Sequence, residues 1–209
     1  MKNKTIPSSG SHKVTNEVIF NLIVERITDS SRILDFGAGA GYMCAKIGDH
    51  LAAKGLGPEE RLKACEITPE KFLYEGVECQ EISTNSVIPF DDSTFDLIYS
   101  IEVIEHTPRP YDFLAEAFRK LRGGGHLIFS VPNILHMKSR LGFLFTGFGD
   151  MFGPPSTLEK NAGRICGHIM PLNYSHLHYG LKRAGFEDIK FFVDRRKRSS
   201  LFLALLFYP

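Results

Sequence analysis

Three glycines follow a short apolar run near the start of the chain. Residues 33–41 read ILDFGAGAG, with Asp35 inside the run and Gly37, Gly39 and Gly41 at every second position after it. A glycine turn between a strand and a helix permits positive φ angles, lets a ligand approach the backbone, and exposes the unpaired N–H groups of the helix start. A tight connection that needs small residues is the alternative. Three alternating glycines favour a nucleotide-type cofactor, although GxGxG departs from the GxGxxG pyrophosphate fingerprint.

A carboxylate ends the next apolar segment. Glu66 lies in ACEI, where a second strand is expected to finish. A carboxylate at this place can accept hydrogen bonds from both hydroxyls of a ribose. An acid that ends a strand can also be a solvated cap. The glycine turn beside it favours the ribose contact.

Glu102, Glu105 and His106 stand together in IEVIEH, directly after a strong apolar strand. Ligands of α/β sheets lie beyond the carboxyl ends of the strands, so these side chains are candidates for acid–base work. His106 is the candidate base because an unperturbed imidazole titrates near neutral pH. Glu102 could face the acceptor. The alternative is that both acids are cap or salt-bridge residues and the imidazole is packed. His168, further along, is a candidate for orienting the acceptor.

Strands and helices are expected to alternate along the chain. Helical spacing or helix-start signals are found at 14–27, 41–55, 68–76, 110–125 and 173–186. Apolar strand patterns are found at 32–39, 62–67, 77–82, 95–103, 126–132, 186–194 and 201–208. Such alternation predicts a parallel sheet with helices on both faces.

Four segments, DFGAGAG, ACEI, IPFDDSTFDLIYSIEVIEH and FLAEAFRKLRGGGHLIFSVPN, together resemble the class I S-adenosylmethionine-dependent methyltransferases. FDLIYSIEVIEH and LRGGGHLIFSVPN are most similar to the small-molecule O-methyltransferases of ubiquinone-type pathways. The resemblance is dense over residues 31–133 and resumes at GHIMPLNYSHLHYGLKRAGF. It implies an α/β Rossmann-like domain covering residues 1–209. Its seven-stranded sheet would have the order 3-2-1-4-5-7-6, with an antiparallel seventh strand supplied by residues 201–208.

The same resemblance implies S-adenosylmethionine as the cofactor and assigns residues to it. The methionine end would lie against the glycine turn, Glu66 would hold the ribose and Ile67 would pack on the adenine. Many relatives have an acid shortly before an LPF-like segment, and this chain has only Ser83, Thr84 and Asn85 there. The full set of implied cofactor contacts is Asp35, Gly37, Ala38, Gly39, Gly41, Glu66, Ile67, Asn85, Ser100 and Ile101.

The sulfonium methyl of that cofactor is already activated, so the enzyme mainly aligns the acceptor in line with it and excludes water. His106, Glu102 and His168 are the residues assigned to catalysis. A divalent ion is a second possibility. Glu102, Glu105, His106 and His168 resemble the metal site of small-RNA 2′-O-methyltransferases and could bind Mg²⁺, Mn²⁺ or Zn²⁺. EVIEH also resembles many relatives that have no assigned metal.

Residues 134–170 interrupt the alternation and are rich in Gly, Phe, Met and Pro. The segment is too long for a plain connection. It follows the fifth strand, where the family usually builds its acceptor pocket. An apolar lid over cofactor and acceptor is one interpretation, and a helical subdomain with an aromatic core is the other. The apolar residues concerned are Met137, Phe143, Phe145, Phe148, Met151, Phe152 and Met170.

Composition limits the partners. The 209 residues are 43% hydrophobic and 23% charged, which is typical of a soluble globular domain. With 25 basic and 24 acidic residues the net charge is +1, so bulk charge does not indicate nucleic acid. Cys44, Cys65, Cys79 and Cys166 form no CxxC pair, which favours a reducing cytosol. The basic turn 195–198 before 201–208 could be a solvated hairpin or a weak peripheral membrane contact.

The sequence therefore predicts a cytosolic methyltransferase acting on an oxygen of a small-molecule or carrier-linked acceptor. A sugar, a quinone precursor and a lipid head group all remain open, and nitrogen and carbon acceptors are not excluded. Two other functions stay possible. One is a nicotinamide-dependent oxidoreductase on a similar sheet, and the other is a non-catalytic binding subunit that keeps the fold.

Overall fold

The computed structural model describes residues 7–82, 87–153 and 167–195. Its centre is a five-stranded sheet of order β3-β2-β1-β4-β5, and every neighbouring pair is parallel. The strands are β1 (Ile33–Phe36), β2 (Leu62–Glu66), β3 (Cys79–Glu81), β4 (Phe95–Ile101) and β5 (Leu121–Ser130). The predicted α/β class and the order of the first five strands are confirmed.

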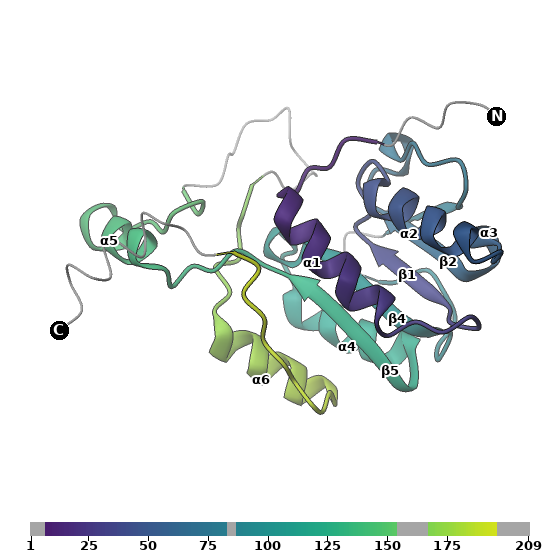
Figure 1. Ribbon diagram of the computed structural model, residues 1–209. Helices are drawn as coiled ribbons and strands as arrows, with labels where there is room; N and C mark the ends of the chain where they lie inside the picture. The colour runs from purple at the N-terminus through teal and green to yellow at the C-terminus, as the bar shows by residue number, and fades with distance from the viewer. Residues whose placement is uncertain (1–6, 83–86, 154–166, 196–209) are drawn as a thin grey trace.

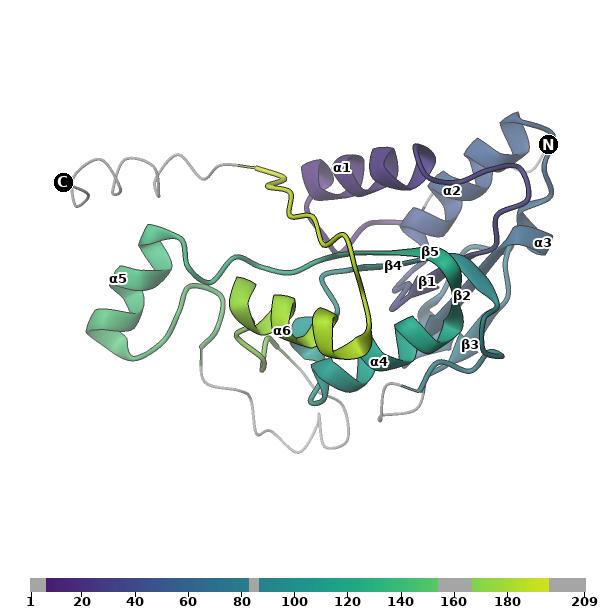
Figure 2. The same cartoon turned by 90° about the horizontal axis from the view of Figure 1, so that it is seen from below.

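Helices cover both faces of this sheet (Figures 1 and 2). On one face α1 (Lys13–Val24) and α2 (Tyr42–Ala53) contribute Ile23, Ile47 and Leu51 to a core. On the other face α4 (Pro110–Lys120) and α6 (Tyr174–Ala184) contribute Phe113 and Leu181 to a second core. All four residues of β1 are buried, as expected of a strand covered on both sides. The remaining helical segments are α3 (Pro58–Arg61), α5 (Met137–Thr146) and the 3₁₀ turns η1 (Pro69–Lys71) and η2 (Ile104–His106).

The ends of α6 show why the chain forms a helix there. The Asn173 side chain accepts a hydrogen bond from the His176 N–H at 3.1 Å, and Gly185 ends the helix at φ +111°. Gly180 lets α6 pack closely on α4, because a Cβ atom at this position would lie 2.6 Å from the Tyr111 ring. These contacts hold α6 against α4. They thereby also position residues 167–172, which lead into α6.

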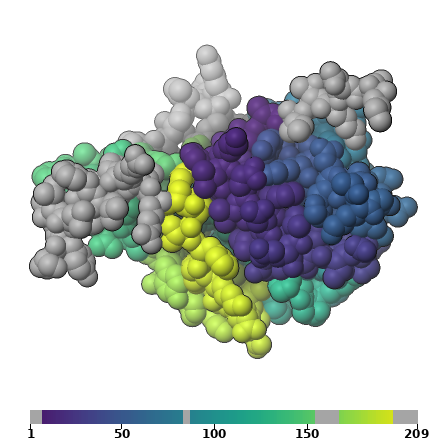
Figure 3. All heavy atoms as spheres, viewed as in Figure 1, coloured from purple at the N-terminus to yellow at the C-terminus, as the bar shows by residue number. Residues whose placement is uncertain are grey.

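Two sequence predictions about secondary structure are wrong. Residues 186–194 form no strand. In the predicted order, residues 186–194 would pair only with the seventh strand at 201–208, which lies outside the described residues. Asn85 and the basic residues 196–198 also lie outside the described residues. Instead this segment runs beside α1 (Figure 3), and the Thr15 hydroxyl donates a hydrogen bond to Asp194. The expected helix after β2 is only the 3₁₀ turn η1, since the Leu73 N–H donates to the Ala40 carbonyl and holds the chain against the glycine turn.

The segment after β5 contains α5, which stands apart from the sheet and its covering helices (Figures 1 and 2). The break in the alternation was predicted, and a helix within it was expected for the helical-subdomain interpretation. Phe143, Phe145 and Phe148 are exposed, so these three rings do not form the aromatic core that this interpretation included. Among the described residues, no helix has the length and apolarity needed to cross a bilayer.

Candidate functional site

Three connections meet at the carboxyl edge of the sheet. The glycine turn follows β1, Glu66 ends β2, and residues 102–106 follow β4. Because β2, β1 and β4 are adjacent and parallel, these segments emerge side by side. This edge is where open α/β sheets bind their ligands.

The three glycines of the turn all have positive φ, but they face different surroundings. A Cβ atom on Gly37 would lie 2.5 Å from Val103, and one on Gly41 would lie 2.9 Å from Phe72 and Tyr74. A Cβ atom on Gly39 would meet nothing within 4 Å. Gly37 and Gly41 are therefore required by packing within the protein. Gly39 alone presents bare backbone to open space, as a ligand-binding turn requires.

Glu66 is tied to this bare backbone. Its Oε2 accepts a hydrogen bond from the Gly39 N–H at 2.7 Å, and its Oε1 accepts one from the Ile67 N–H at 2.8 Å. Each carboxylate oxygen has a second lone pair, so both can still accept a hydroxyl proton. The predicted ribose ligand and the glycine turn are thus one connected unit.

Asp35 points away from the open side of the turn. Its side chain is buried, and its Oδ2 accepts hydrogen bonds from the Tyr99 hydroxyl at 2.8 Å and the Cys44 thiol at 3.2 Å. Burial raises the pKa of Asp35 to about 7, against the lowering effect of these two hydrogen bonds, and the nearby charge of Glu66 adds to the rise. Asp35 therefore braces the base of the turn. Its contact with the methionine end of a cofactor stays a prediction.

We expect Asp35 to make the protein less stable as the pH rises. The carboxyl pKa is 3.8 when unperturbed and about 7 in the folded chain, so the folded state holds the proton more tightly. Its contribution to stability is present below about pH 4 and is lost as the pH rises through about 7. In Asp35→Asn, urea unfolding should show a flatter pH dependence over this range than in the wild type. Equal slopes in the two proteins would contradict the assignment.

The other predicted cofactor contacts divide by exposure. Ile67 is 45% exposed beside Glu66, as a surface for an adenine would be. Ala38 and Ile101 are half-buried and pack against the core that α1 and α2 cover. Ser100 is buried on β4, and its hydroxyl has no hydrogen-bond partner among the described residues.

Glu105, His106 and His168 form one cluster. One ligand atom from each of the three lies within 4.8 Å of the others. His168 Nε2 lies 4.0 Å from Glu105 Oε1, and the two imidazole rings meet edge to face at 4.7 Å between centroids. The cluster depends on η2 and on the backbone of residues 167–170, because the Ile169 and Met170 N–H groups both donate to the Glu105 carbonyl. His106 and His168, predicted separately, are thus brought together.

Protonation within the cluster follows from its contacts. His106 Nδ1 lies 2.8 Å from the Gly167 carbonyl, which can only accept, so Nδ1 carries the proton and Nε2 has the free lone pair of the neutral ring. The Glu105 carboxyl is 1% exposed, and neither oxygen accepts a hydrogen bond from a described residue. Burial raises the pKa of Glu105 to about 8 and lowers the pKa of His168. A base and a buried carboxyl therefore lie side by side.

Glu102 is not part of this cluster. It has a φ of +53°, which is strained for a non-glycine residue, and its N–H donates to the Ser130 carbonyl and hydroxyl. Glu102 lines a cavity of about 1600 Å³ that runs along β5, between α1 and α6, to the start of α5. Glu102 therefore faces the cavity from the sheet edge. The four-residue metal set predicted from the sequence reduces to three.

Several contacts of the site were not predicted. Val103 packs on Gly37, and Tyr99 and Cys44 hold Asp35. Phe152 is buried with its ring 5.0 Å from that of His168, whereas the other phenylalanines predicted for the acceptor side, Phe143, Phe145 and Phe148, are exposed. The alternation along β4 carried a signal for Tyr99, but no local pattern distinguished Phe152 from the others.

A parallel sheet with a bare glycine turn after its first strand and a carboxylate at the end of the next defines a nucleotide-cofactor-binding α/β protein. The chain belongs to the methyltransferase domain family, whose sequence model matches residues 12–190. Its fold and glycine turn are those of the class I S-adenosylmethionine-dependent methyltransferases, as the resemblance implied.

Named relatives transfer methyl groups to different atoms. The chain is 34% identical over 120 residues to the sarcosine/dimethylglycine N-methyltransferase of Halorhodospira halochloris, a match covering 52% of this chain and 43% of that enzyme. It is 29% identical over 117 residues to the ubiquinone biosynthesis O-methyltransferase of Maricaulis maris, covering 54% and 45%. The matched part thus spans less than half the length of either relative.

Among solved structures, an S-adenosylmethionine-dependent methyltransferase from Mesorhizobium loti superposes with a TM-score of 0.57 at 14% identity. The superposition covers 85% of this chain and 82% of that protein. At this identity the likeness shows the fold alone.

Proposed function

We propose that the protein transfers a methyl group from S-adenosylmethionine to an oxygen of a small-molecule or carrier-linked acceptor. The observation that carries the proposal is the bare backbone at Gly39 joined by a hydrogen bond to Glu66. Open space above the turn at Gly39, next to a carboxylate with free lone pairs, suits a ligand with an amino-acid tail and a ribose. Family membership supports the same cofactor.

The chain's own residues would act mainly by positioning the cofactor and the acceptor. The cofactor would lie along the glycine turn with its ribose on Glu66 and its adenine on Ile67, and the acceptor would approach from the Glu102 side. His106 Nε2 would take the acceptor proton, since Nδ1 donates to Gly167. Such a base adds about 10²- to 10⁴-fold to the rate. Phe152 and His168 would exclude water from the acceptor side.

A ligand titration tests this function against its rivals. Isothermal calorimetry should detect S-adenosylmethionine and S-adenosylhomocysteine but no NADH or NADPH. Release of S-adenosylhomocysteine in a panel of hydroxylated and aminated acceptors would then identify the accepting atom. Binding of a nicotinamide cofactor in place of the sulfonium compounds would overturn the proposal. Sulfonium binding with no turnover on any acceptor would favour a binding subunit, and turnover on amines alone would overturn the oxygen assignment.

The cluster of Glu105, His106 and His168 could also hold a divalent ion. Two imidazoles and a buried carboxylate without a hydrogen-bond donor match the ligands of Mn²⁺, Fe²⁺ or Zn²⁺, and the bond from His106 to Gly167 orients the ring as in metal sites. When bound, such an ion would lower the pKa of an acceptor hydroxyl.

We expect Mn²⁺ titrated into the protein to bind with an affinity that falls at least about tenfold in Glu105→Gln, because the charged ligand is lost. Glu102→Gln, which removes a neighbouring carboxylate outside the cluster, is the matched control and should bind as the wild type does. Calorimetry or the Mn²⁺ electron paramagnetic resonance signal reads out binding without activity. Absence of binding in the wild type, or equal affinities in both variants, would dismiss the ion.

We propose the seventh strand of the predicted order, at 201–208, because β5 has a free edge among the described residues. Among the described residues β5 pairs only with β4, its residues 127–129 are half-exposed, and the large cavity lies beside it. An apolar strand at 201–208 beside β5 would pair with this free edge.

Truncation after residue 198 should therefore speed amide hydrogen exchange on the free edge of β5 and leave β1 unchanged. Exchange of β5 that is insensitive to the truncation would contradict the seventh strand.

The remaining proposals concern the domain organisation, the cellular compartment and the partners. We retain one domain over residues 1–209, with 134–170 as an acceptor-side insert to which Phe152 and His168 belong. A reducing cytosol is consistent with the free thiols of Cys44, Cys65 and Cys79. We propose no nucleic-acid partner, because the net charge is only +1.

A further inference from the structure

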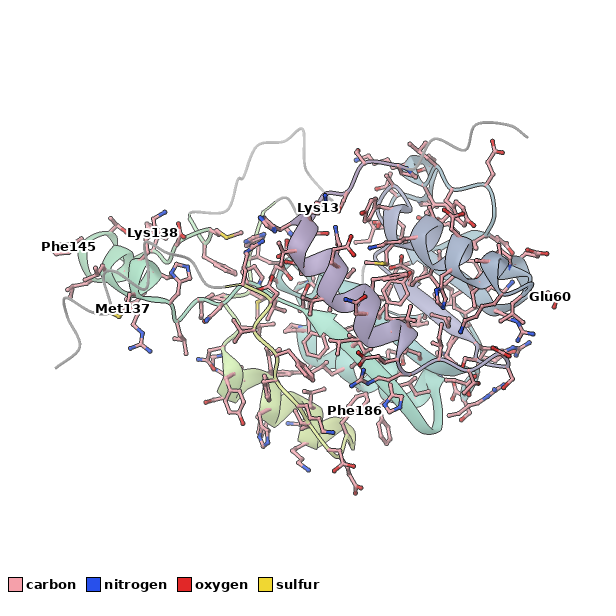
Figure 4. All side chains as sticks on the ribbon, in the orientation of Figure 1. Lys13, Glu60, Met137, Lys138, Phe145 and Phe186 are labelled. Atoms are coloured by element: carbon pink, nitrogen blue, oxygen red, sulfur yellow. The ribbon has the colours of Figure 1, made fainter. Side chains whose placement is uncertain are left out.

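Helix α5 carries large apolar side chains that its own fold does not use. Phe143, Leu144 and Phe145 are 65%, 73% and 81% exposed, and Phe148 just beyond the helix is 44% exposed. We call these four residues the apolar tip. Figure 4 shows Phe145 at the end of α5 farthest from the sheet, pointing away from the body of the protein. Apolar side chains gathered in this way on a solvent-exposed surface mark an interaction site.

Polar bonds hold this part of the chain together without the apolar tip. The buried Ser139 hydroxyl accepts the Asp150 N–H at 2.9 Å, Gly147 caps the helix at φ +76°, and the Phe148 N–H donates to the Thr146 hydroxyl at 3.2 Å. Residues 147–152 thus fold back on the inner side of α5. The exposed rings point outward from a braced support and are free to contact something else.

The angular spread of the tip decides what that partner can be. Phe143, Leu144 and Phe145 are consecutive, so at 3.6 residues per turn they cover about 200° of the helix circumference. A flat protein surface can contact only one side of such a helix. A fluid bilayer can surround it. The spread also argues against a helix lying flat on a membrane, which would carry its apolar residues on one face.

Charge near the tip favours an anionic membrane. Lys138 and Arg140 are exposed in the first turns of α5, and the only acid in residues 134–153 is Asp150. Asp150 lies 3.1 Å from Lys138 and 3.4 Å from His136. With the C-terminal turn of α5 inserted, these cations would stand at the level of the lipid head groups, where each attracts anionic lipid.

We propose that the tip of α5 inserts end-on into an anionic lipid surface and docks the protein there. The cavity that Glu102 lines also reaches Met137 and Arg140 in the first turn of α5. Docking would therefore bring the α5 end of this cavity toward the lipid head groups. The docking itself does not depend on the methyl transfer proposed above. It differs from the sequence expectation of a membrane contact through 195–208, because it uses other residues.

Vesicle sedimentation tests the proposal. The full chain should sediment with vesicles of phosphatidylcholine containing about one third phosphatidylglycerol. In Leu144→Ser/Phe145→Ser we expect the partition coefficient to fall at least about tenfold, from the loss of inserted apolar groups. In Lys138→Gln/Arg140→Gln it should fall about fivefold per charge, and only on anionic vesicles.

The matched control is Phe192→Ser/Val193→Ser, which removes two adjacent side chains that are 58% and 77% exposed elsewhere on the surface. It should bind as the wild type does, and equal unfolding temperatures of all variants would confirm that each is folded. Wild-type protein that ignores anionic vesicles, or Leu144→Ser/Phe145→Ser that binds them unchanged, would overturn the proposal. A concentration-dependent dimer that the tip variant abolishes would assign the surface to a second copy instead.

Discussion

Glu66→Ala is expected to raise the dissociation constant for S-adenosylhomocysteine by roughly 10- to 150-fold. The carboxylate would hold the ribose hydroxyls, and hydrogen bonds to a charged group contribute about 1.5 to 3 kcal/mol. The same carboxylate holds the Gly39 and Ile67 N–H groups, so its removal also loosens the backbone on which the cofactor would lie. Calorimetric titration of the two proteins measures the difference directly.

A matched control separates a specific contact from a change in net charge. Glu78 is an exposed carboxylate just before β3, at the amino end of that strand, whereas Glu66 lies at the carboxyl end of β2. Glu78→Ala should leave the affinity unchanged. A ligand that lacks the ribose 2′-hydroxyl should also lose less on Glu66→Ala than the intact ligand does. Unchanged affinity for the intact ligand would remove the ribose assignment and, with it, the main support for the proposed cofactor.

Gly37→Ala is expected to lower the free energy of unfolding by about 2 to 5 kcal/mol. A φ of +77° costs about 1 to 2 kcal/mol for a residue with a Cβ atom. The new methyl group would also lie 2.5 and 2.8 Å from the two methyl groups of Val103, and overpacking of this kind costs about 1 to 3 kcal/mol. Urea unfolding at one fixed pH measures the total.

Two further variants divide that loss into its parts. Gly39 has a φ of +54°, but a Cβ atom there would lie in open space. Gly39→Ala should therefore lower the free energy of unfolding by only about 1 to 2 kcal/mol, while it weakens cofactor binding. Because Val103→Ala removes the clashing methyl groups, Gly37→Ala should cost about 1 to 3 kcal/mol less in that background than in the wild type. If Gly37→Ala destabilises no more than Gly39→Ala, the packing role of Gly37 is wrong.

Much of the fold could be predicted because its signals are local. Helical spacing gave the main helices close to their observed bounds. Apolar runs gave the five strands. The short turn η1 was mistaken for a helix because its end is set by a bond from Leu73 to Ala40, far away in the sequence. No local pattern reports such a bond.

The site divides in the same way. The sequence by itself determined that a glycine turn, the carboxylate of Glu66 and the pair Glu105 and His106 would meet at one edge of the sheet, since parallel strands bring their carboxyl ends together. Only the tertiary structure decided that Gly39 is the open glycine, that Asp35 turns inward to Tyr99, and that His168 joins Glu105 from 63 positions away. Which side chains touch across such separations depends on how whole elements pack, and spacing along the chain carries no record of it.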